Sequence, residues 1–110
     1  MQTIVELAEF SKNADKLFSE AERLSLIKYL AAHPASGEMM QGTGGIRKLR
    51  WSAHGKGKSG GVRVVYYFHN ESMPLFLLTL FGKGEKSNLL KSERNELAKF
   101  ARLLIKNYGG

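Results

Sequence analysis

Side chains that can bind phosphate are concentrated in the middle of this sequence. Apart from histidine, all charged residues between positions 46 and 70 are basic, which gives the segment a net charge of +6: Arg47, Lys48, Arg50, Lys56, Lys58 and Arg63. Eight of the twelve glycines lie between Gly37 and Gly61, and glycine lets a backbone approach a ligand closely. Basic charge and accessible backbone in one segment predict a polyanionic partner, most often a nucleic acid.

Arg63 carries the clearest chemical signal, because it interrupts a strand pattern made of Val, Tyr and Phe. Val62, Val64 and Tyr66 alternate onto one face, which we expect to be the core, and Arg63 falls on the other face. We therefore expect truncation of Arg63 to leave the core intact. A guanidinium held in a strand presents fixed donors to a phosphate, whereas the alternative is an exposed arginine paired with an acid such as Glu85.

The segment from His54 to Gly61 links two expected strands, and its lysines are Lys56 and Lys58. Gly57-Lys58-Ser59 copies the end of a nucleotide-binding P-loop, but Ser52 stands where that motif requires glycine and a strand follows instead of a helix. This excludes nucleotide binding of that kind. Two interpretations stay open, a basic finger that meets phosphates and an ordinary hairpin loop kept soluble by lysine.

Lys83, Glu85 and Lys86 follow the last expected strand, and they should lie near Arg63 if the strands form a meander. The alternative is a solvated charged turn. The histidines at positions 33, 54 and 69 lack metal-ligand spacing, so we expect neither a metal nor another cofactor.

Apolar periodicity predicts the elements that position these side chains. In order they are a strand, two helices, three strands and a helix, at residues 3–7, 11–17, 20–32, 46–51, 62–68, 75–81 and 97–108. Ser19 and Glu22 form a capping box before the second helix, and Pro34 ends it. In the last helix the apolar stripe is Leu97, Phe100, Ala101, Leu104 and Tyr108. The prediction is one α+β domain over residues 1–110, β–α–α–β–β–β–α, with a small, mainly antiparallel sheet packed against helices.

The composition narrows the class of protein further. The chain has 110 residues, a net charge of +7 and no cysteine, which excludes disulfides, thiolate chemistry and cysteine zinc sites and favours the cytoplasm. Acidic residues in the first twenty positions argue against a signal peptide, and no apolar run is long enough to span a membrane.

An ordered series of motifs resembles the RelE/ParE superfamily of toxins, and more closely the HigB-like branch of type II toxin–antitoxin systems. The motifs are Pro34-x-x-Gly37, the run from Met40 to Arg50, the run from Gly55 to Arg63, Val65-Tyr66-Tyr67, and the run from Phe76 to Lys83. The resemblance implies a RelE-like fold and a toxin that cleaves mRNA in the A site of the 30S ribosomal subunit. It also implies a helix-turn-helix antitoxin that neutralises the toxin and carries it to operator DNA.

The resemblance also implies roles for individual residues. Arg63 matches an arginine that contacts the scissile phosphate, Lys48 and Arg50 match part of a basic strand, and Lys83 and Lys86 match basic positions after the last strand. The chain departs from the RelE pattern at two positions: Gly84 stands where arginine is common, and Leu90 stands near the position of a catalytic tyrosine.

Cleavage of this kind uses the 2′-OH of the RNA as nucleophile, so the protein must hold the phosphate, stabilise charge and move two protons. We expect Arg63 to stabilise the charge. Lys56, Lys58 or Lys83 would move protons if clustered charge lowers a lysine pKa, with Glu85 as a reserve base. The expected RNA- and ribosome-binding set is Arg47, Lys48, Arg50, Lys56, Lys58 and Lys86. Two rival functions stay open, a gyrase-poisoning toxin on the same fold and a non-catalytic RNA- or ribosome-binding module.

Overall fold

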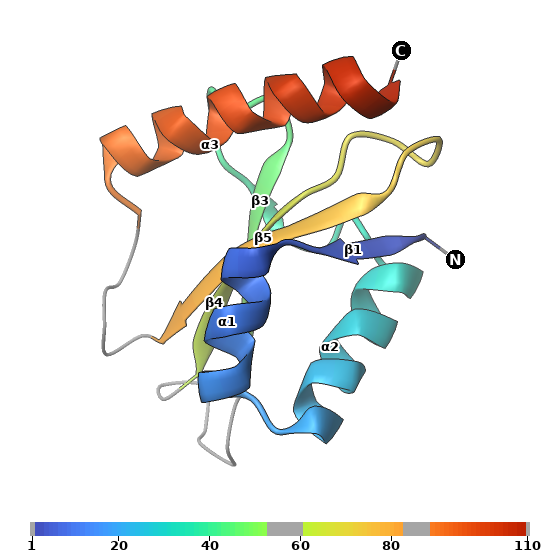
Figure 1. The fold of residues 1–110 in the computed structure, drawn as a ribbon, viewed down its shortest axis with the longest axis vertical. Helices are drawn as coiled ribbons and strands as arrows, with labels where there is room; N and C mark the ends of the chain where they lie inside the picture. Colours follow the sequence, from blue (N-terminus) through green and yellow to red (C-terminus); the bar gives the residue numbers. More distant parts are fainter. Residues whose placement is uncertain (1, 53–60, 83–88, 110) are drawn as a thin grey trace.

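The structure is a computed structural model that describes residues 2–52, 61–82 and 89–109. Its elements are β1 (Ile4–Glu6), α1 (Ala8–Leu17), α2 (Glu20–Ala32), β2 (Glu38–Met39), β3 (Ile46–Trp51), β4 (Val62–Tyr67), β5 (Leu75–Gly82), α3 (Lys91–Leu104) and a π-helical turn, η2 (Ile105–Gly109) (Figure 1). The described part contains the predicted α+β arrangement, with one further short strand, β2.

The five strands form one sheet in the order β1-β5-β4-β3-β2. β2, β3, β4 and β5 pair in antiparallel fashion, which confirms the predicted meander, while β1 lies parallel to β5 at the edge. Val62 pairs with Gly82 and Arg63 with Phe81, so the end of β5 lies beside the start of β4, as predicted.

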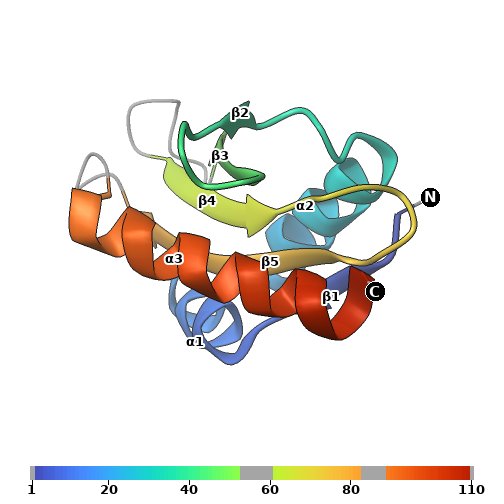
Figure 2. The same ribbon diagram turned by 90° about the horizontal axis from the view of Figure 1, so that it is seen from above.

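Helices cover both faces of this sheet, and each face has its own apolar core (Figure 2). Val62, Val64 and Tyr66 of β4 pack with side chains of α1 and α2, whereas Val65 and Tyr67 pack in the core that includes α3. The prediction of one core face on β4 was therefore wrong. The same alternation places apolar side chains of β5 in both cores, which confirms a strand covered on both sides.

The helices begin and end for local reasons. Ser19 Oγ accepts a hydrogen bond from the Glu22 backbone at 3.2 Å, and the Ser19 backbone donates to Glu22 Oε1 at 2.8 Å, so the predicted capping box is present. α2 ends at Ala32, just before His33-Pro34. α1 begins at Ala8, earlier than predicted, because its first turn includes Phe10, which is fully buried.

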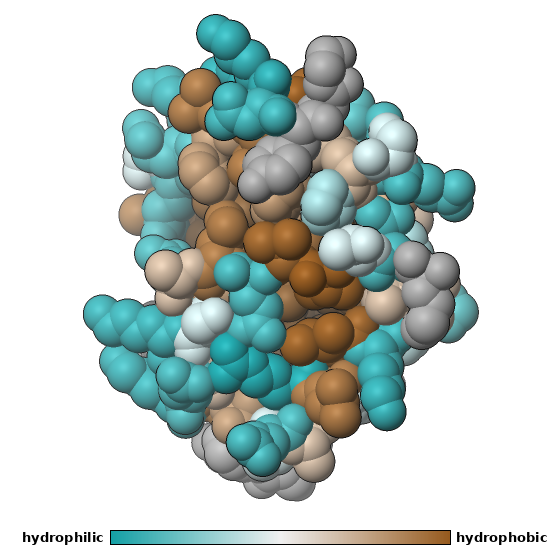
Figure 3. Space-filling view, turned by 45° about the vertical axis from the view of Figure 1, so that its right-hand side comes forward, coloured by the Kyte–Doolittle hydropathy of each residue, from teal (hydrophilic) through white to brown (hydrophobic). Residues whose placement is uncertain are grey.

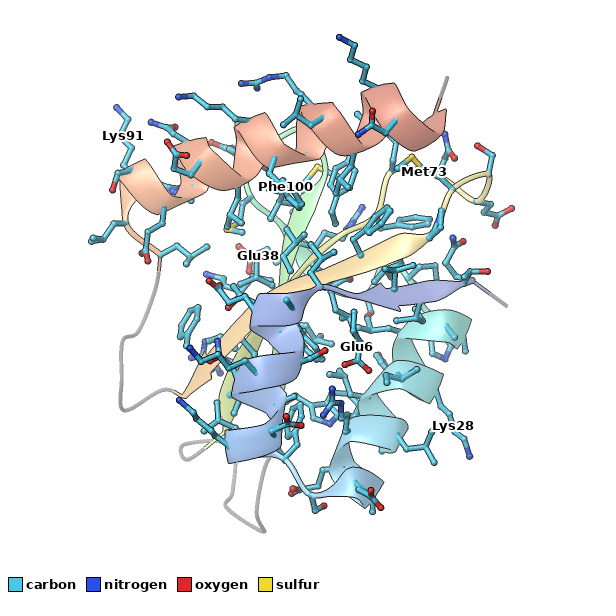
Figure 4. All side chains as sticks on the ribbon, in the orientation of Figure 1. Glu6, Lys28, Glu38, Met73, Lys91 and Phe100 are labelled. Atoms are coloured by element: carbon cyan, nitrogen blue, oxygen red, sulfur yellow. The ribbon has the colours of Figure 1, made fainter. Side chains whose placement is uncertain are left out.

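An arginine links the first three elements. Arg23 of α2 bonds Glu6 of β1 and, at 2.7 Å, Asp15 of α1, and Figure 4 shows Glu6 pointing from β1 towards α2. The hydrogen bond to Glu6 is the main cause that raises the pKa of Arg23, while burial acts in the opposite direction. The two carboxylates thus fix both N-terminal helices to the edge of the sheet.

The C-terminal helix differs in part from its predicted stripe. Ala98, Ala101 and Leu104 are buried, and Leu97 packs beside them, but Phe100 is 38% exposed. The buried side is centred on Ala98 and Ala101, which turns Phe100 towards its margin. The side chain of Tyr108 lies outside the described residues. Among the helices that are described, none combines the length and apolarity needed to cross a membrane.

Candidate phosphate-binding site

Two arginines face each other where β3 ends and β4 begins. Arg50 is the register partner of Arg63, so both side chains start from the same face of the sheet. Directly opposed like charges destabilise a sheet. A fold that keeps two arginines there has a local electrostatic cost that a bound anion would remove.

One nitrogen of the buried Arg63 guanidinium has no hydrogen-bond acceptor in the described part of the chain. The residue is 6% exposed, and its Nη1 has no hydrogen-bond partner among the described residues. This contradicts the alternative of an exposed strand arginine, because the face that Arg63 shares with Val65 and Tyr67 is itself covered. A buried unpaired donor is costly, and such groups are common where a ligand supplies the missing acceptor.

Arg50 and Arg63 are lining residues of two clefts. One has a volume of about 700 Å³ and is lined by residues of α2, β3 and β4, among them Ala21, Ser25, Arg50, Trp51, Val62 and Arg63. The other has a volume of about 460 Å³ and is lined by Ser36, Glu38, Lys48, Leu49, Arg50 and Arg63. Alternation places the side chains of Arg50 and Arg63 on the face of the sheet that also carries Lys48, which is a lining residue of the second cleft.

Lys48 lies next to this pair but has an acidic neighbour. It is partly buried and is opposite Val65 of β4 and Glu38 of β2. Alternation places it on the side of the sheet that carries Arg50 and Arg63. The sequence pattern missed β2 because a strand of two exposed residues has too few positions for alternation to be visible.

Arg47, by contrast, binds the protein backbone. Its Nη1 donates to the carbonyl oxygens of Ala35 at 3.1 Å and of Gly37 at 2.8 Å. It pairs with Tyr66, so it starts from the face opposite to Arg50 and Arg63. This geometry gives Arg47 a positioning role for the loop before β2.

Tyr66 holds the same loop from within the core. Its hydroxyl donates to the carbonyl of Pro34 at 2.8 Å and accepts from the Gly37 backbone at 2.8 Å. Burial raises the pKa of Tyr66, and the hydrogen bond from Gly37 opposes that shift. A Cβ on Gly37 would lie 2.7 Å from the Tyr66 hydroxyl oxygen, so the spacing Pro34-x-x-Gly37 is the spacing that this clamp requires.

Trp51 forms part of the first cleft and is held by its neighbours. The indole packs against the core that β4 shares with α1 and α2, and its ring centroid lies 5.2 Å from that of Tyr29 on α2. Sequence reasoning did not single out Ala21 and Ser25 as cleft residues. Their spacing could have indicated that they lie on the same side of α2 as Tyr29, since residues four apart share a helix face.

The remaining predicted site residues are Lys56, Lys58, Lys83, Glu85 and Lys86, and they lie outside the described residues. Two of the three histidines are described, and within that part of the chain no group of three or more His, Cys, Asp or Glu side chains could hold a metal ion.

A comparison with known protein families assigns the chain to one of them. The family model described as "RelE toxin of RelE / RelB toxin-antitoxin system" matches residues 15–108. The chain belongs to the RelE toxin family. It is therefore a toxin of a toxin–antitoxin system and pairs with an antitoxin. The matched part of this RelE toxin includes both clefts and the Arg50–Arg63 pair.

Proposed function

We propose that this RelE toxin is a ribosome-dependent endoribonuclease that cuts mRNA in the A site of the 30S subunit. The observation that carries the proposal is the buried Arg63, whose Nη1 has no partner among the described residues and which lies opposite Arg50 beside a cleft that Lys48 also lines. A phosphodiester supplies the acceptors that this site lacks, and it neutralises two adjacent positive charges.

In this reaction the RNA supplies its own nucleophile, so the protein mainly has to bind the phosphate and stabilise its negative charge. The 2′-OH of the RNA attacks the adjacent phosphorus, the bond to the 5′-oxygen of the next nucleotide breaks, and negative charge accumulates on the non-bridging oxygens. Arg63 donates to those oxygens, and its burial strengthens the interaction because little water competes. Arg50 provides a second cation at the same phosphate, and Lys48 extends the basic strand along the RNA.

Proton transfer is assigned to residues beyond the described part of the chain. Lys56, Lys58 and Lys83 are the proposed proton-transfer groups, with Glu85 as a reserve base, and Lys86 adds to RNA binding. Lys83 follows directly after Gly82, which pairs with Val62 at the start of β4. Arg47 is proposed to act by positioning the loop that it binds.

The proposal includes the HigB-like subtype and a helix-turn-helix antitoxin that brings the toxin to operator DNA. It also treats residues 1–110 as one toxin domain that acts in the cytoplasm, where the ribosomes are. An antitoxin needs a surface to bind, and Figure 3 shows a band of apolar surface between hydrophilic regions. Exposed apolar side chains occur on α2 and α3, at Leu24, Tyr29, Phe100 and Leu103. Such surface fits a protein partner.

The direct test is to map mRNA 5′ ends in cells after brief induction of the wild type, of Arg63→Lys and of Arg102→Lys. Arg102 is an exposed arginine of α3 and serves as the matched control. We expect cuts within translated codons for the wild type and the control, and a loss of about 10²-fold or more for Arg63→Lys, since an ammonium cannot reproduce the planar fork.

Other outcomes would refute the proposal. DNA breaks without mRNA cuts would make the chain a gyrase poison, and ribosome binding with neither would make it a non-catalytic module. Failure of the adjacent gene product to co-purify with the chain and restore growth would contradict the proposed antitoxin.

A further inference from the structure

The second cleft holds an acidic side chain among its cations. Of the described residues that line this cleft of about 460 Å³, Glu38 alone carries a carboxylate, and the cations are Lys48, Arg50 and Arg63. Glu38 is exposed, and none of the ion pairs formed among the described residues involves it. Charged lysine and arginine side chains only donate hydrogen bonds, whereas a carboxylate only accepts them. Glu38 is therefore the charged group of this cleft that can take a proton from a bound substrate.

Strand pairing places this carboxylate on the same side of the sheet as the arginines. β2 is the edge strand next to β3 (Figure 2), and Glu38 is the register partner of Lys48. Lys48 and Arg50 alternate onto one face, and Arg50 is in turn opposite Arg63. Ordinary strand spacing separates the Cα atoms of Glu38 and Arg63 by roughly 12 Å. Two extended side chains of these types can span that gap with a phosphodiester between them.

The backbone that carries Glu38 is held on both sides. The Gly37 N–H donates to the Tyr66 hydroxyl at 2.8 Å, and the Gly37 carbonyl accepts from Arg47 Nη1 at 2.8 Å. On the other side of Glu38, Met39 pairs with Arg47 in the ladder between β2 and β3. The carboxylate therefore starts from a fixed segment of chain, which is the support that a catalytic side chain needs.

We propose that Glu38 is the general base of RNA cleavage. The inference rests on the proposed endonuclease function and adds the group that activates the nucleophile. The carboxylate takes the proton of the 2′-OH while the 2′-oxygen forms its bond to phosphorus and the bond from phosphorus to the 5′-oxygen breaks. The 5′-oxygen takes a proton from one of the lysines proposed above, so the products are a 2′,3′-cyclic phosphate and a 5′-hydroxyl.

The surrounding cations allow a carboxylate to work beside a phosphate. Lys48, Arg50 and Arg63 supply three positive charges, and the carboxylate and the phosphodiester supply one negative charge each. Neutralising Glu38 removes a repulsion of the RNA and leaves the phosphate contacts in place. Loss of this carboxylate should therefore slow the chemical step without weakening binding, whereas a structural role would change both together.

Glu38→Gln is the test variant and Glu71→Gln is the matched control, since Glu71 is exposed in the turn that follows β4, beyond the end of the strand away from Arg63. The assay is single-turnover cleavage on programmed ribosomes over a series of toxin concentrations. At saturation Glu38→Gln should cut about 10²-fold more slowly or less, the contribution of a general base, and its half-saturating concentration should not rise. Glu71→Gln should match the wild type in both quantities, and all three proteins should melt at similar temperatures.

Two further measurements identify the proton that Glu38 moves. Glu38→Asp keeps the carboxylate on a shorter stem, so it should retain more activity than Glu38→Gln. An mRNA with sulfur in place of the 5′-oxygen at the cleaved bond has a leaving group that needs no protonation. This substrate should leave the deficit of Glu38→Gln unchanged, because the 2′-OH still has to lose its proton.

Four results would overturn the inference while the endonuclease proposal stands. Glu38→Gln could cut as fast as the wild type, or Glu38→Asp could lose as much activity as Glu38→Gln. The sulfur substrate could restore Glu38→Gln, which would make Glu38 the acid, or Glu38→Gln could lose affinity and Tm together, which would make its role structural. If the wild type does not cut on any programmed ribosome, the endonuclease proposal fails and the assignment of Glu38 fails with it.

Discussion

Replacing Arg63 with methionine should make the protein more stable and nearly inactive. Methionine keeps a stem of similar length for packing but removes the guanidinium. The substitution eliminates a buried donor, Nη1, that has no partner among the described residues, and it eliminates a like-charge pair with Arg50. Stability and activity should therefore change in opposite directions, as expected where a fold retains a costly group for its function.

The size of the stability gain follows from these two contributions. An unsatisfied buried polar group costs about 1–3 kcal/mol, and a cross-strand pair of like charges adds up to about 1 kcal/mol. We expect the free energy of unfolding to rise by about 1–3 kcal/mol, which corresponds to a Tm increase of roughly 4–13 °C for a domain of this size. The strand pattern alone, in which truncation of Arg63 leaves the core intact, predicts instead the small change of a surface residue, within about 0.5 kcal/mol.

The assay pairs thermal and urea unfolding with single-turnover mRNA cleavage on programmed ribosomes. Cleavage by Arg63→Met should fall about 10²–10³-fold, the effect of losing one preorganised donor to a developing negative charge. Arg102→Met is the control, since Arg102 is exposed on α3, and it should change neither quantity. A lower Tm for Arg63→Met would refute the burial argument, and cleavage within threefold of wild type would remove Arg63 from the active site.

Three further predictions concern charge, packing and pH. Lys56→Ala combined with Lys58→Ala should weaken ribosome binding and flatten its salt dependence, because fewer phosphates are neutralised; an unchanged salt slope in binding titrations would contradict the basic finger. Gly37→Ala should lower the free energy of unfolding by about 1–3 kcal/mol in urea melts, since the new Cβ lies 2.7 Å from the Tyr66 hydroxyl oxygen, and an unchanged midpoint would count against the clamp. Burial raises the pKa of Tyr67 above its unfolded value of about 10, so its contribution to stability is complete below that pH and is lost as the pH rises through the folded pKa. Tyr67→Phe removes a buried hydroxyl that has no hydrogen-bond partner in the described part of the chain, so Tm should not fall at pH 7 and should decline less between pH 9 and 11; a steeper alkaline decline would refute this reasoning.

Local sequence signals determined most of the secondary structure. The capping box at Ser19 and Glu22 and the proline at position 34 bound α2, and the change to a period of two at Ile46 marks the start of β3. These signals act within a few residues, so they can be recognised without knowing the rest of the fold. The same holds for the concentration of basic charge, which is a property of composition along the chain.

Burial of Arg63 was decided by tertiary structure. Alternation shows that Arg63 shares a face with Val65 and Tyr67, but it does not show whether water or another part of the protein covers that face. The second core, which includes side chains of α3, covers it. The hydrogen bonds of Arg47 could not be predicted from alternation either, because its carbonyl acceptors lie in a loop more than nine residues earlier in the chain.

The cleft depends on pairing between distant segments as well. The sequence specifies small side chains at Ala21 and Ser25 and a large one at Tyr29, but these become the wall of a cleft because α2 lies against the ends of β3 and β4. The position of β1 beside β5 likewise depends on contacts across about seventy residues. The sequence by itself determined which residues carry charge and which elements form, apart from the short strand β2, whereas the long-range packing of those elements decided which charges are buried and where a ligand can enter.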